Sequence, residues 1–259
     1  MGTTVGACCI RVSDREATVA FYEALGLSCV GRYGTGEDES ATVGHPDKGG
    51  RLQIGQRVGG EGPLDLGTAL WKLYVNTNDI EELHATALAN GATEVMAPLR
   101  MEQWPTSVSF VTDRDGILVE LVQRHPWLDG DDTSRSWVGQ SCIDVSDLDR
   151  AVAFWELLGL TCTSRTSIPD AEEAILEDPD HGGKIQLAQH HDGRAIEFGD
   201  AMWKLYLYVE DAEAAHDAAV AAGHRSFKAP VRVDEWGVTV AMVRDPDGFL
   251  VELLQRHAG

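Results

Sequence analysis

The sequence predicts an α+β protein of two tandem domains, each made of two modules in which a strand, a helix and three strands follow one another. Three observations support this class. A long internal repeat divides the 259 residues into two copies. Alternating apolar residues, typical of strands, and apolar residues at helical spacing succeed each other in the same order four times. The composition, with 43% hydrophobic and 24% charged residues, is that of a folded globular protein.

The repeat covers nearly the whole chain. The segment VGACCIRVSDREATVAFYEALGL from Val5 matches VGQSCIDVSDLDRAVAFWELLGL from Val138, an offset of 133 residues. After one deletion, LWKLYVN at 70–76 matches MWKLYLY at 202–208, an offset of 132 residues. Repetition on this scale indicates two copies of one structural unit. The expected parts are a first domain at 1–125, an acidic linker at 126–137 and a second domain at 138–259.

The first module begins with a predicted strand at 7–14, where apolar and polar residues alternate. The segment after it has helical spacing, with Asp14 placed to cap its start and Gly26 placed at its C-terminal end. Short strands follow and end with RLQIG at 51–55. The module therefore reads as strand, helix and strands.

The second module begins with the aromatic strand LWKLYVN at 70–76. A helix over 79–91 is closed by Gly91. Two further strands, at 107–112 and 117–123, are joined by the turn DRDG. The second copy repeats all of these elements, so four modules are expected.

This arrangement resembles the vicinal oxygen chelate superfamily, which includes glyoxalase I, extradiol dioxygenases, fosfomycin-resistance enzymes and bleomycin-binding proteins. The resemblance rests on VSDREATVAFYEALGL, VSDLDRAVAFWELLGL and, near the end of the chain, EWGVTVAMVRDPDGFLVEL. It implies that the two modules of each domain form one cup-shaped sheet. It also implies where a divalent metal would bind, because catalytic members use His, His and Glu on the first, fifth and last strands of the domain.

The usual ligands are replaced at most of these positions. Transferred by motif position, the three places hold Ala7, Lys72 and Glu120 in the first domain and Gln140, Lys204 and Glu252 in the second, with Gln53 or Gln186 at a fourth inward position. A protonated lysine has three donors and no lone pair, so it cannot ligate a cation. We therefore expect no metal cofactor. If a metal binds at all, the resemblance leaves Gln140 and Glu252 to hold it.

Alternation along the strands predicts which side chains face the cup. Each lysine shares a face with the tyrosine two residues later, whereas Trp71 and Trp203 are expected on the opposite face, under the helices. If the family geometry holds, each lysine lies near a glutamate at the centre of its cup. We predict that Lys204, Glu252 and Tyr206 are catalytic in the second domain.

The remaining candidates line the same predicted site. Those expected to bind the ligand are Gln140, Cys142, Asp144, Gln186, Tyr208 and Trp236. The first-domain equivalents Lys72, Glu120 and Tyr74 are expected to form a degenerate site, with the lysine and glutamate kept because a buried charge without its partner is costly. Trp236 could instead be a core anchor. His190 and His191, in the segment QHHDG, are expected to lie in a polar loop.

Composition excludes several other classes. A formal net charge of −21 repels phosphate backbones, which argues against nucleic acid as a partner. No apolar run approaches the roughly 20 residues of a membrane helix, and the N-terminus does not resemble a signal peptide. Five cysteines without paired spacing suggest free thiols in the cytoplasm. The expected state is a monomer or a homodimer.

We therefore expect a cytoplasmic protein that binds a small aromatic or polyketide-like metabolite. The favoured activity is metal-independent lyase, isomerase or cyclase chemistry. One alternative is a non-catalytic protein that sequesters a toxic compound, as bleomycin-binding relatives do. Another is a metal-dependent enzyme that resembles extradiol dioxygenases, although a lysine at 204 in place of histidine disfavours it.

Overall fold

The computed structural model describes residues 2–34, 39–47, 49–57, 63–126, 136–178 and 181–257. The first repeat contains β1 (Thr4–Val12), α1 (Arg15–Ala24), β2 (Ser28–Tyr33), β3 (Ser40–Gly44), β4 (Arg51–Gln56), β5 (Leu70–Asn76), α2 (Ile80–Ala89), β6 (Thr93–Arg100), β7 (Thr106–Thr112) and β8 (Leu118–Arg124). The second contains β9 (Trp137–Asp144), α3 (Leu148–Leu157), β10 (Thr161–Ser167), β11 (Ala171–Asp178), β12 (His181–His190), β13 (Met202–Tyr208), α4 (Ala212–Ala221), β14 (Ser226–Val233), the 3₁₀ turn η2 (Asp234–Trp236), β15 (Val238–Arg244) and β16 (Leu250–Arg256).

The predicted fold class is confirmed, because the chain forms four βαβββ modules and two cup-shaped sheets. In each module the first strand pairs in parallel with the last, as β1 does with β4 and β13 does with β16. Of the predicted linker, residues 127–135 lie outside the described part of the chain, and Trp137 already begins β9.

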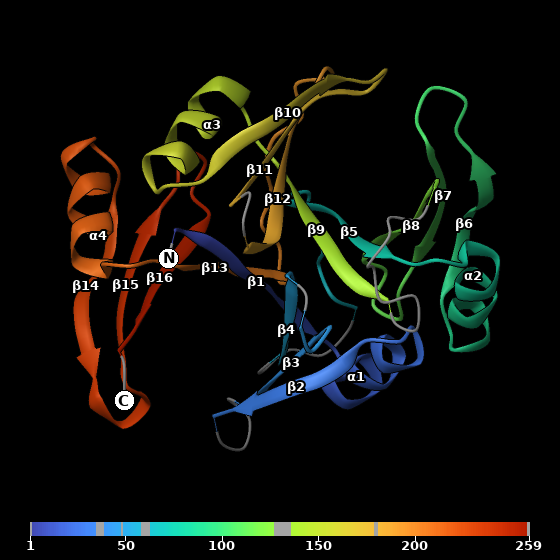
Figure 1. Ribbon diagram of the computed structural model, residues 1–259, viewed down its shortest axis with the longest axis horizontal. Coiled ribbons are helices and arrows are strands. Elements are labelled where there is room, and N and C mark those ends of the chain that lie inside the picture. The colour runs from blue at the N-terminus through green and yellow to red at the C-terminus, as the bar shows by residue number, and fades with distance from the viewer. Residues whose placement is uncertain are drawn as a thin grey trace.

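The two modules that share a sheet come from different repeats. In the first sheet, which we call cup A, the strand order is β14-β15-β16-β13-β1-β4-β3-β2, with β1 antiparallel to β13. In the second sheet, cup B, the order is β6-β7-β8-β5-β9-β12-β11-β10, with β5 antiparallel to β9. The cups meet where β1 pairs with β12 (Figure 1).

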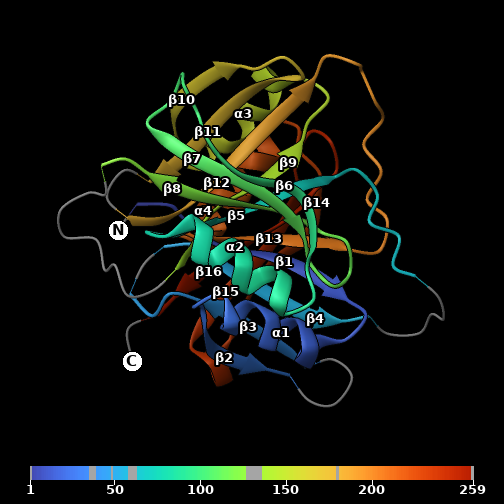
Figure 2. The same cartoon turned by 90° about the vertical axis from the view of Figure 1, so that its right-hand side faces the viewer.

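The expectation that each repeat closes its own cup is therefore wrong. Modules of one repeat instead meet through their helices, since α1 contacts α2 and α3 contacts α4. Figure 2 shows α1 and α2 side by side. A sequence repeat reveals which modules are alike, but not which of them share hydrogen bonds.

The hydrophobic core lies on the helix side of the sheets. Along β1, the buried side chains of Cys8, Ile10 and Val12 belong to this core. Because side chains alternate, Cys9 and Arg11 face the cup instead. This alternation supplies the inner wall of each cup.

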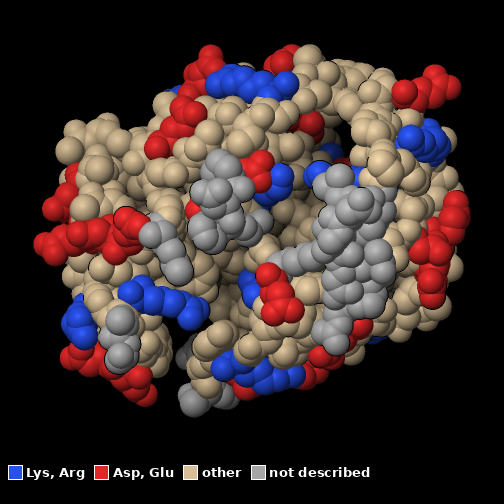
Figure 3. Space-filling model, in the orientation of Figure 1, with Lys and Arg blue, Asp and Glu red and all other residues tan. Residues whose placement is uncertain are grey.

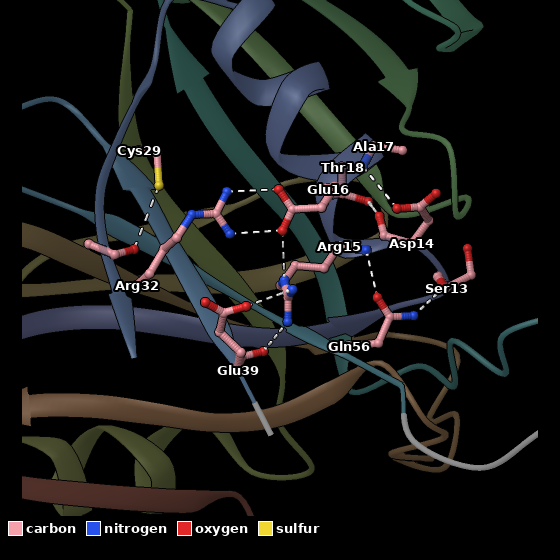
Figure 4. Close-up of polar contacts among 11 residues, drawn as sticks. Ser13, Asp14, Arg15, Glu16, Ala17, Thr18, Cys29, Arg32, Glu39 and Gln56 are labelled. Carbon is pink, nitrogen blue, oxygen red and sulfur yellow. Dashed lines mark hydrogen bonds and ion pairs between the residues drawn. The ribbon is translucent and has the colours of Figure 1, made fainter. Parts of the chain in front are cut away.

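The four α-helices in the described part of the chain begin after an aspartate, and each of these side chains accepts a backbone N–H of the first turn. The capping residues are Asp14, Asp79, Asp147 and Asp211. Figure 4 shows the start of α1, where Glu16 also accepts two hydrogen bonds from Arg32. The Arg32 guanidinium, with that of Arg15, lowers the pKa of Glu16 to about 2.

The segments that lead into β5 and β13 are bonded to each other. The backbone N–H of Ala69 donates to Glu197 O at 2.9 Å, and that of Asp200 donates to Asp65 O at 2.6 Å. The backbones approach so closely that a Cβ on Gly67, where φ is 61°, would lie 2.0 Å from Glu197 O. Only glycine fits this crossing.

All five cysteines are free, as predicted. None of the helices within the described ranges has the length and apolar character needed to cross a membrane.

Candidate functional site

Cup A is centred on Lys204. Its Nζ donates to Glu252 Oε2 at 2.7 Å, and the two side chains are only 9% and 6% exposed. The ammonium lies 4.3 Å from the ring centroid of Trp203 and 4.5 Å from that of Tyr206. The predicted contact between lysine and glutamate is confirmed.

The opposite wall of cup A comes from the first repeat. Cys9 lies directly across from Lys204 in the β1–β13 pair, and its Sγ donates to Gln53 Oε1 at 3.0 Å. Gln53 Nε2 in turn donates to Ser40 Oγ at 2.9 Å. Burial, with the nearby Cys9 and Glu252, raises the pKa of Tyr206, so its phenol stays protonated and can donate.

Cup B has the same plan around Lys72, but with a second carboxylate. Lys72 Nζ lies 3.0 Å from Glu120 Oε2 and 4.0 Å from Glu173 Oε1. The ring centroids of Trp71 and Tyr74 lie 4.0 and 5.1 Å from the ammonium. Burial acts to lower the pKa of Lys72, but the nearby acidic groups, Glu120 foremost, outweigh it and raise the pKa.

The other wall of cup B comes from the second repeat. Cys142 lies opposite Lys72, and Gln140 Nε2 donates to Gln186 Oε1. At the end of the same wall, Asp144 contacts Arg194 Nε at 2.9 Å and His190 Nε2 at 3.1 Å. Burial raises the pKa of Asp144 to about 7, although Arg194 opposes this.

The structure separates residues that the sequence placed in one site. Gln140, Cys142, Asp144 and Gln186 lie in cup B, and not beside Lys204 as expected. The reason is the pairing of β1 with β13, which brings first-repeat residues to Lys204. In addition, β13, β1 and β12 lie between β16 and β9, the strands of Glu252 and Gln140. Those two side chains face different cups and cannot ligate one ion, so that assignment is wrong.

The two tryptophans before the lysines are also displaced from the expected face. The β5–β9 register shifts between Leu70 and Lys72, and the β1–β13 register shifts at the same place in cup A. Each bulge inserts one residue and turns its side chain. Trp71 therefore contacts His190 edge to face, with 4.5 Å between ring centroids, and Trp203 lies 4.9 Å from the Arg11 guanidinium.

Three further candidates differ in their surroundings. His190 is the last residue of β12, and its side chain is 7% exposed, so its expected place in a polar loop is wrong. Trp236 is 69% exposed and is not a core anchor. Tyr208 packs over β1, where a Cβ on Gly6 would lie 2.6 Å from its ring.

Glu173 was not foreseen from the sequence, although a signal was present. On β11, Ala174 and Leu176 are buried in the core beneath the helices. Strand alternation therefore points Glu173, the residue before Ala174, into the cup. An acidic residue at such a position is uncommon, which marks it for attention.

The comparisons with known proteins agree with this architecture. The family model described as Glyoxalase/Bleomycin resistance protein/Dioxygenase superfamily matches residues 4–121 and 137–253. The chain belongs to the glyoxalase superfamily. The crystal structure of glyoxalase I from Zea mays superposes with a TM-score of 0.84 at 20% identity, covering 98% of this chain and 92% of that one.

Two curated plant members of the glyoxalase superfamily are similar in sequence. A lactoylglutathione lyase from Oryza sativa is 24% identical, over 94% of this chain and 86% of that protein. Lactoylglutathione lyase GLX1 from Arabidopsis thaliana is 26% identical, over 72% of this chain and 63% of that protein. These are distant relatives, so they establish kinship and not substrate.

The divalent metal implied by the glyoxalase superfamily does not fit the residues of either cup. In each cup a lysine ammonium stands at a ligand position and contacts the remaining glutamate. Within the described ranges, no three His, Cys, Asp or Glu side chains are grouped so that they could hold a metal ion. A divalent metal ion bound to the glutamate of either cup would lie beside the ammonium and be repelled by it.

Proposed function

We propose that this protein binds small organic molecules in its cups and, in cup A, transforms one of them by proton transfer without a metal. The reaction would be of the lyase, isomerase or cyclase type. The substrate class is a small aromatic or polyketide-like compound with a carbonyl group, and the protein works in the cytoplasm. The observation that supports this most directly is the buried contact of Lys204 Nζ with Glu252 Oε2 at 2.7 Å.

Each group in cup A has a chemical role in this proposal. An ammonium has three donors, and Glu252 accepts one of them, so Lys204 can donate another to a carbonyl oxygen that gains negative charge. Glu252 can take a proton from the carbon next to that carbonyl. The Tyr206 phenol, kept protonated, can donate to the same oxygen or return a proton. Trp203 offers a flat apolar face beside the ammonium.

A metal-dependent lactoylglutathione lyase is a less suitable assignment. The two plant relatives described above carry that name and match at 24% and 26% identity, and the ligand positions of both cups are occupied by an ion pair. No step of the proposed reaction therefore involves a metal.

The second candidate is a protein that binds its ligand without changing it. Burial favours this alternative, because Lys204 and Glu252 expose less than a tenth of their side chains. Such a pair can persist without any catalytic role, because loss of one partner leaves a buried charge unpaired. The two functions differ in what Lys204 does after the ligand has bound.

Deuterium exchange distinguishes them. The protein is incubated in D₂O with enolisable ketones such as 1-indanone and acetylacetone, and NMR follows loss of the protons next to the carbonyl. We expect the protein to exchange these protons faster than buffer alone does. Chelators should not reduce this exchange. Lys204→Met and Glu252→Gln should lose it by about a hundredfold or more, whereas Lys228→Met, at an exposed position of the same module, should not. Ketones that bind without exchange would support the binder, and exchange abolished by chelators would overturn metal independence.

A further inference from the structure

The two cups share one framework but differ at a deep position. On β11, Glu173 lies opposite Ala188 of β12; at the equivalent place in cup A, Ser40 of β3 lies opposite Gly55 of β4. Ser40 is neutral and accepts a hydrogen bond from Gln53. Cup A thus has one carboxylate beside its lysine, and cup B has two.

A second difference lies in the same row of residues across the sheet, on the first strand of the module. Arg11 of β1 pairs with Gly55, and Asp144 of β9 pairs with Ala188, so the two are equivalent. Arg11 is exposed above Trp203, whereas Asp144 is buried against Arg194 and His190. Where cup A carries an exposed positive charge, cup B carries a buried carboxyl group that contacts Arg194.

The acidic groups of cup B are not fully compensated. Lys72 faces both Glu120 and Glu173. Glu173 Oε1 is buried and has no hydrogen-bond partner within the described ranges, and the Lys72 ammonium lies 4.0 Å from it. Burial and the neighbouring Glu120 charge raise the pKa of Glu173 despite Lys72. A second cation in this cup would relieve that excess of negative charge.

Open space lies at the edge of cup B. Cavities of about 160 and 90 Å³ adjoin cup B: Trp71 and Arg194 line the first, and Asp144, His190 and Arg194 line the second. Figure 3 shows the surface hollowed between the strands of β10–β11 and those of β7–β8, with charged side chains inside the hollow.

We propose that the cups select ligands of opposite charge. Cup B takes a small aromatic amine, whose ammonium lies against Glu173 and whose ring lies beside Trp71, while Glu120 stays paired with Lys72. Cup A takes a neutral or anionic aromatic compound, which Lys204 and Arg11 recognise. This rests on the proposed function only in that the cups hold small molecules.

Fluorine NMR can report on each cup separately. Protein labelled with 5-fluorotryptophan carries one probe in cup B, Trp71, and one in cup A, Trp203, which Trp71→Phe and Trp203→Phe assign. Benzylamine, benzoate and benzyl alcohol are titrated in turn. We expect benzylamine to shift the Trp71 signal and benzoate the Trp203 signal, each with at least tenfold preference over the oppositely charged compound.

Substitution of Glu173, which distinguishes cup B from cup A, tests whether this carboxylate causes the preference for an amine. Glu173→Ser, which copies cup A, should weaken benzylamine binding at Trp71 about tenfold, and Glu173→Gln should do the same while keeping the side-chain size. Equal affinity of benzylamine and benzyl alcohol for cup B, or unchanged benzylamine binding in Glu173→Gln, would overturn this inference while leaving the proposed function intact. If none of the three compounds shifts either signal, both proposals fail.

Discussion

Lys204 and Lys72 each place an ammonium between a glutamate and two aromatic rings, at 2.7 and 3.0 Å from the carboxylate oxygen. Such a pair is neutral, which lets it remain buried. Its contribution to stability depends on both partners being present. Removal of one partner is therefore expected to cost more than replacement of both.

Lys204→Met should lower the free energy of unfolding by about 3 kcal/mol, because Glu252 is then a buried charge without a partner. The double variant Lys204→Met/Glu252→Leu should recover most of that loss, since a buried ion pair and an apolar pair of similar size are often equally stable. Urea denaturation measures both, with the exposed Lys228→Met as control. A single variant as stable as the parent would show that the pair is not what holds this part of cup A.

Asp144 should make stability depend on pH. Its pKa in the folded protein is about 7, above the value of about 3.9 in an unfolded chain. The folded state thus holds this proton more tightly, and the resulting stability is complete below about pH 4 and is lost as the pH rises through about 7. The parent should lose more stability than Asp144→Asn between pH 5 and pH 8, by about 2 to 3 kcal/mol.

Thermal unfolding at the two pH values measures this difference. Glu102→Gln, at an exposed position, is the control and should follow the parent. Parallel pH profiles for the parent and Asp144→Asn would contradict the assignment of the raised pKa to Asp144.

At the scale of residues, the sequence was sufficient for the contacts that depend only on alternation and on parallel pairing within a module. Lys204 and Glu252 lie on β13 and β16, which belong to one module, and their contact was predicted. The partners of Lys204 across the cup, Cys9 and Gln53, could not be predicted. They depend on which modules share a sheet, and the repeat is compatible with both pairings.

Among elements, the helices agree with prediction because their signals are local. Each begins at a capping aspartate, and α1 and α2 are followed by Gly26 and Gly91, at φ values of 88° and 97° that favour glycine. The bulges at Trp71 and Trp203 were missed. Their cause is not in the strand itself but in the register against a partner strand from the other repeat.

The cap of α4 offers a test at this scale. Asp211 accepts hydrogen bonds from the backbone N–H groups of Glu213 and Ala214, both at 3.0 Å. Asp211→Ala should destabilise the protein by about 1 kcal/mol, and Asp211→Ser should be nearly neutral because its hydroxyl can still accept. Chemical denaturation of both variants checks this. Equal losses for alanine and serine would mean that the side-chain cap is not the stabilising feature.

The whole molecule is held together by contacts between repeats. Cup A needs β1 beside β13, and cup B needs β5 beside β9. The crossing of the connecting segments at Gly67 and Gly199 adds backbone hydrogen bonds between the repeats. The repeat predicted the number and order of modules, but the domains it delimits are not the units that enclose the cups.

A split protein should show this directly. Residues 1–126 and 136–259, expressed as two chains, should associate in equal amounts, because each alone leaves the edges of two central strands unpaired. Light scattering after size-exclusion chromatography, with the intact chain as reference, measures the assembly. Two separately folded monomeric halves would contradict the observed strand pairing.

The construction of each cup from both repeats also determines which cup a single mutation changes. In a twofold dimer of identical two-module chains, every substitution would appear in both cups, and the sites would have to stay the same. Here the two copies are covalently joined, so a change at residue 40 alters only cup A and a change at residue 173 alters only cup B. The two cups therefore share nearly the same backbone, while the side chains inside each cup can change without changing the other.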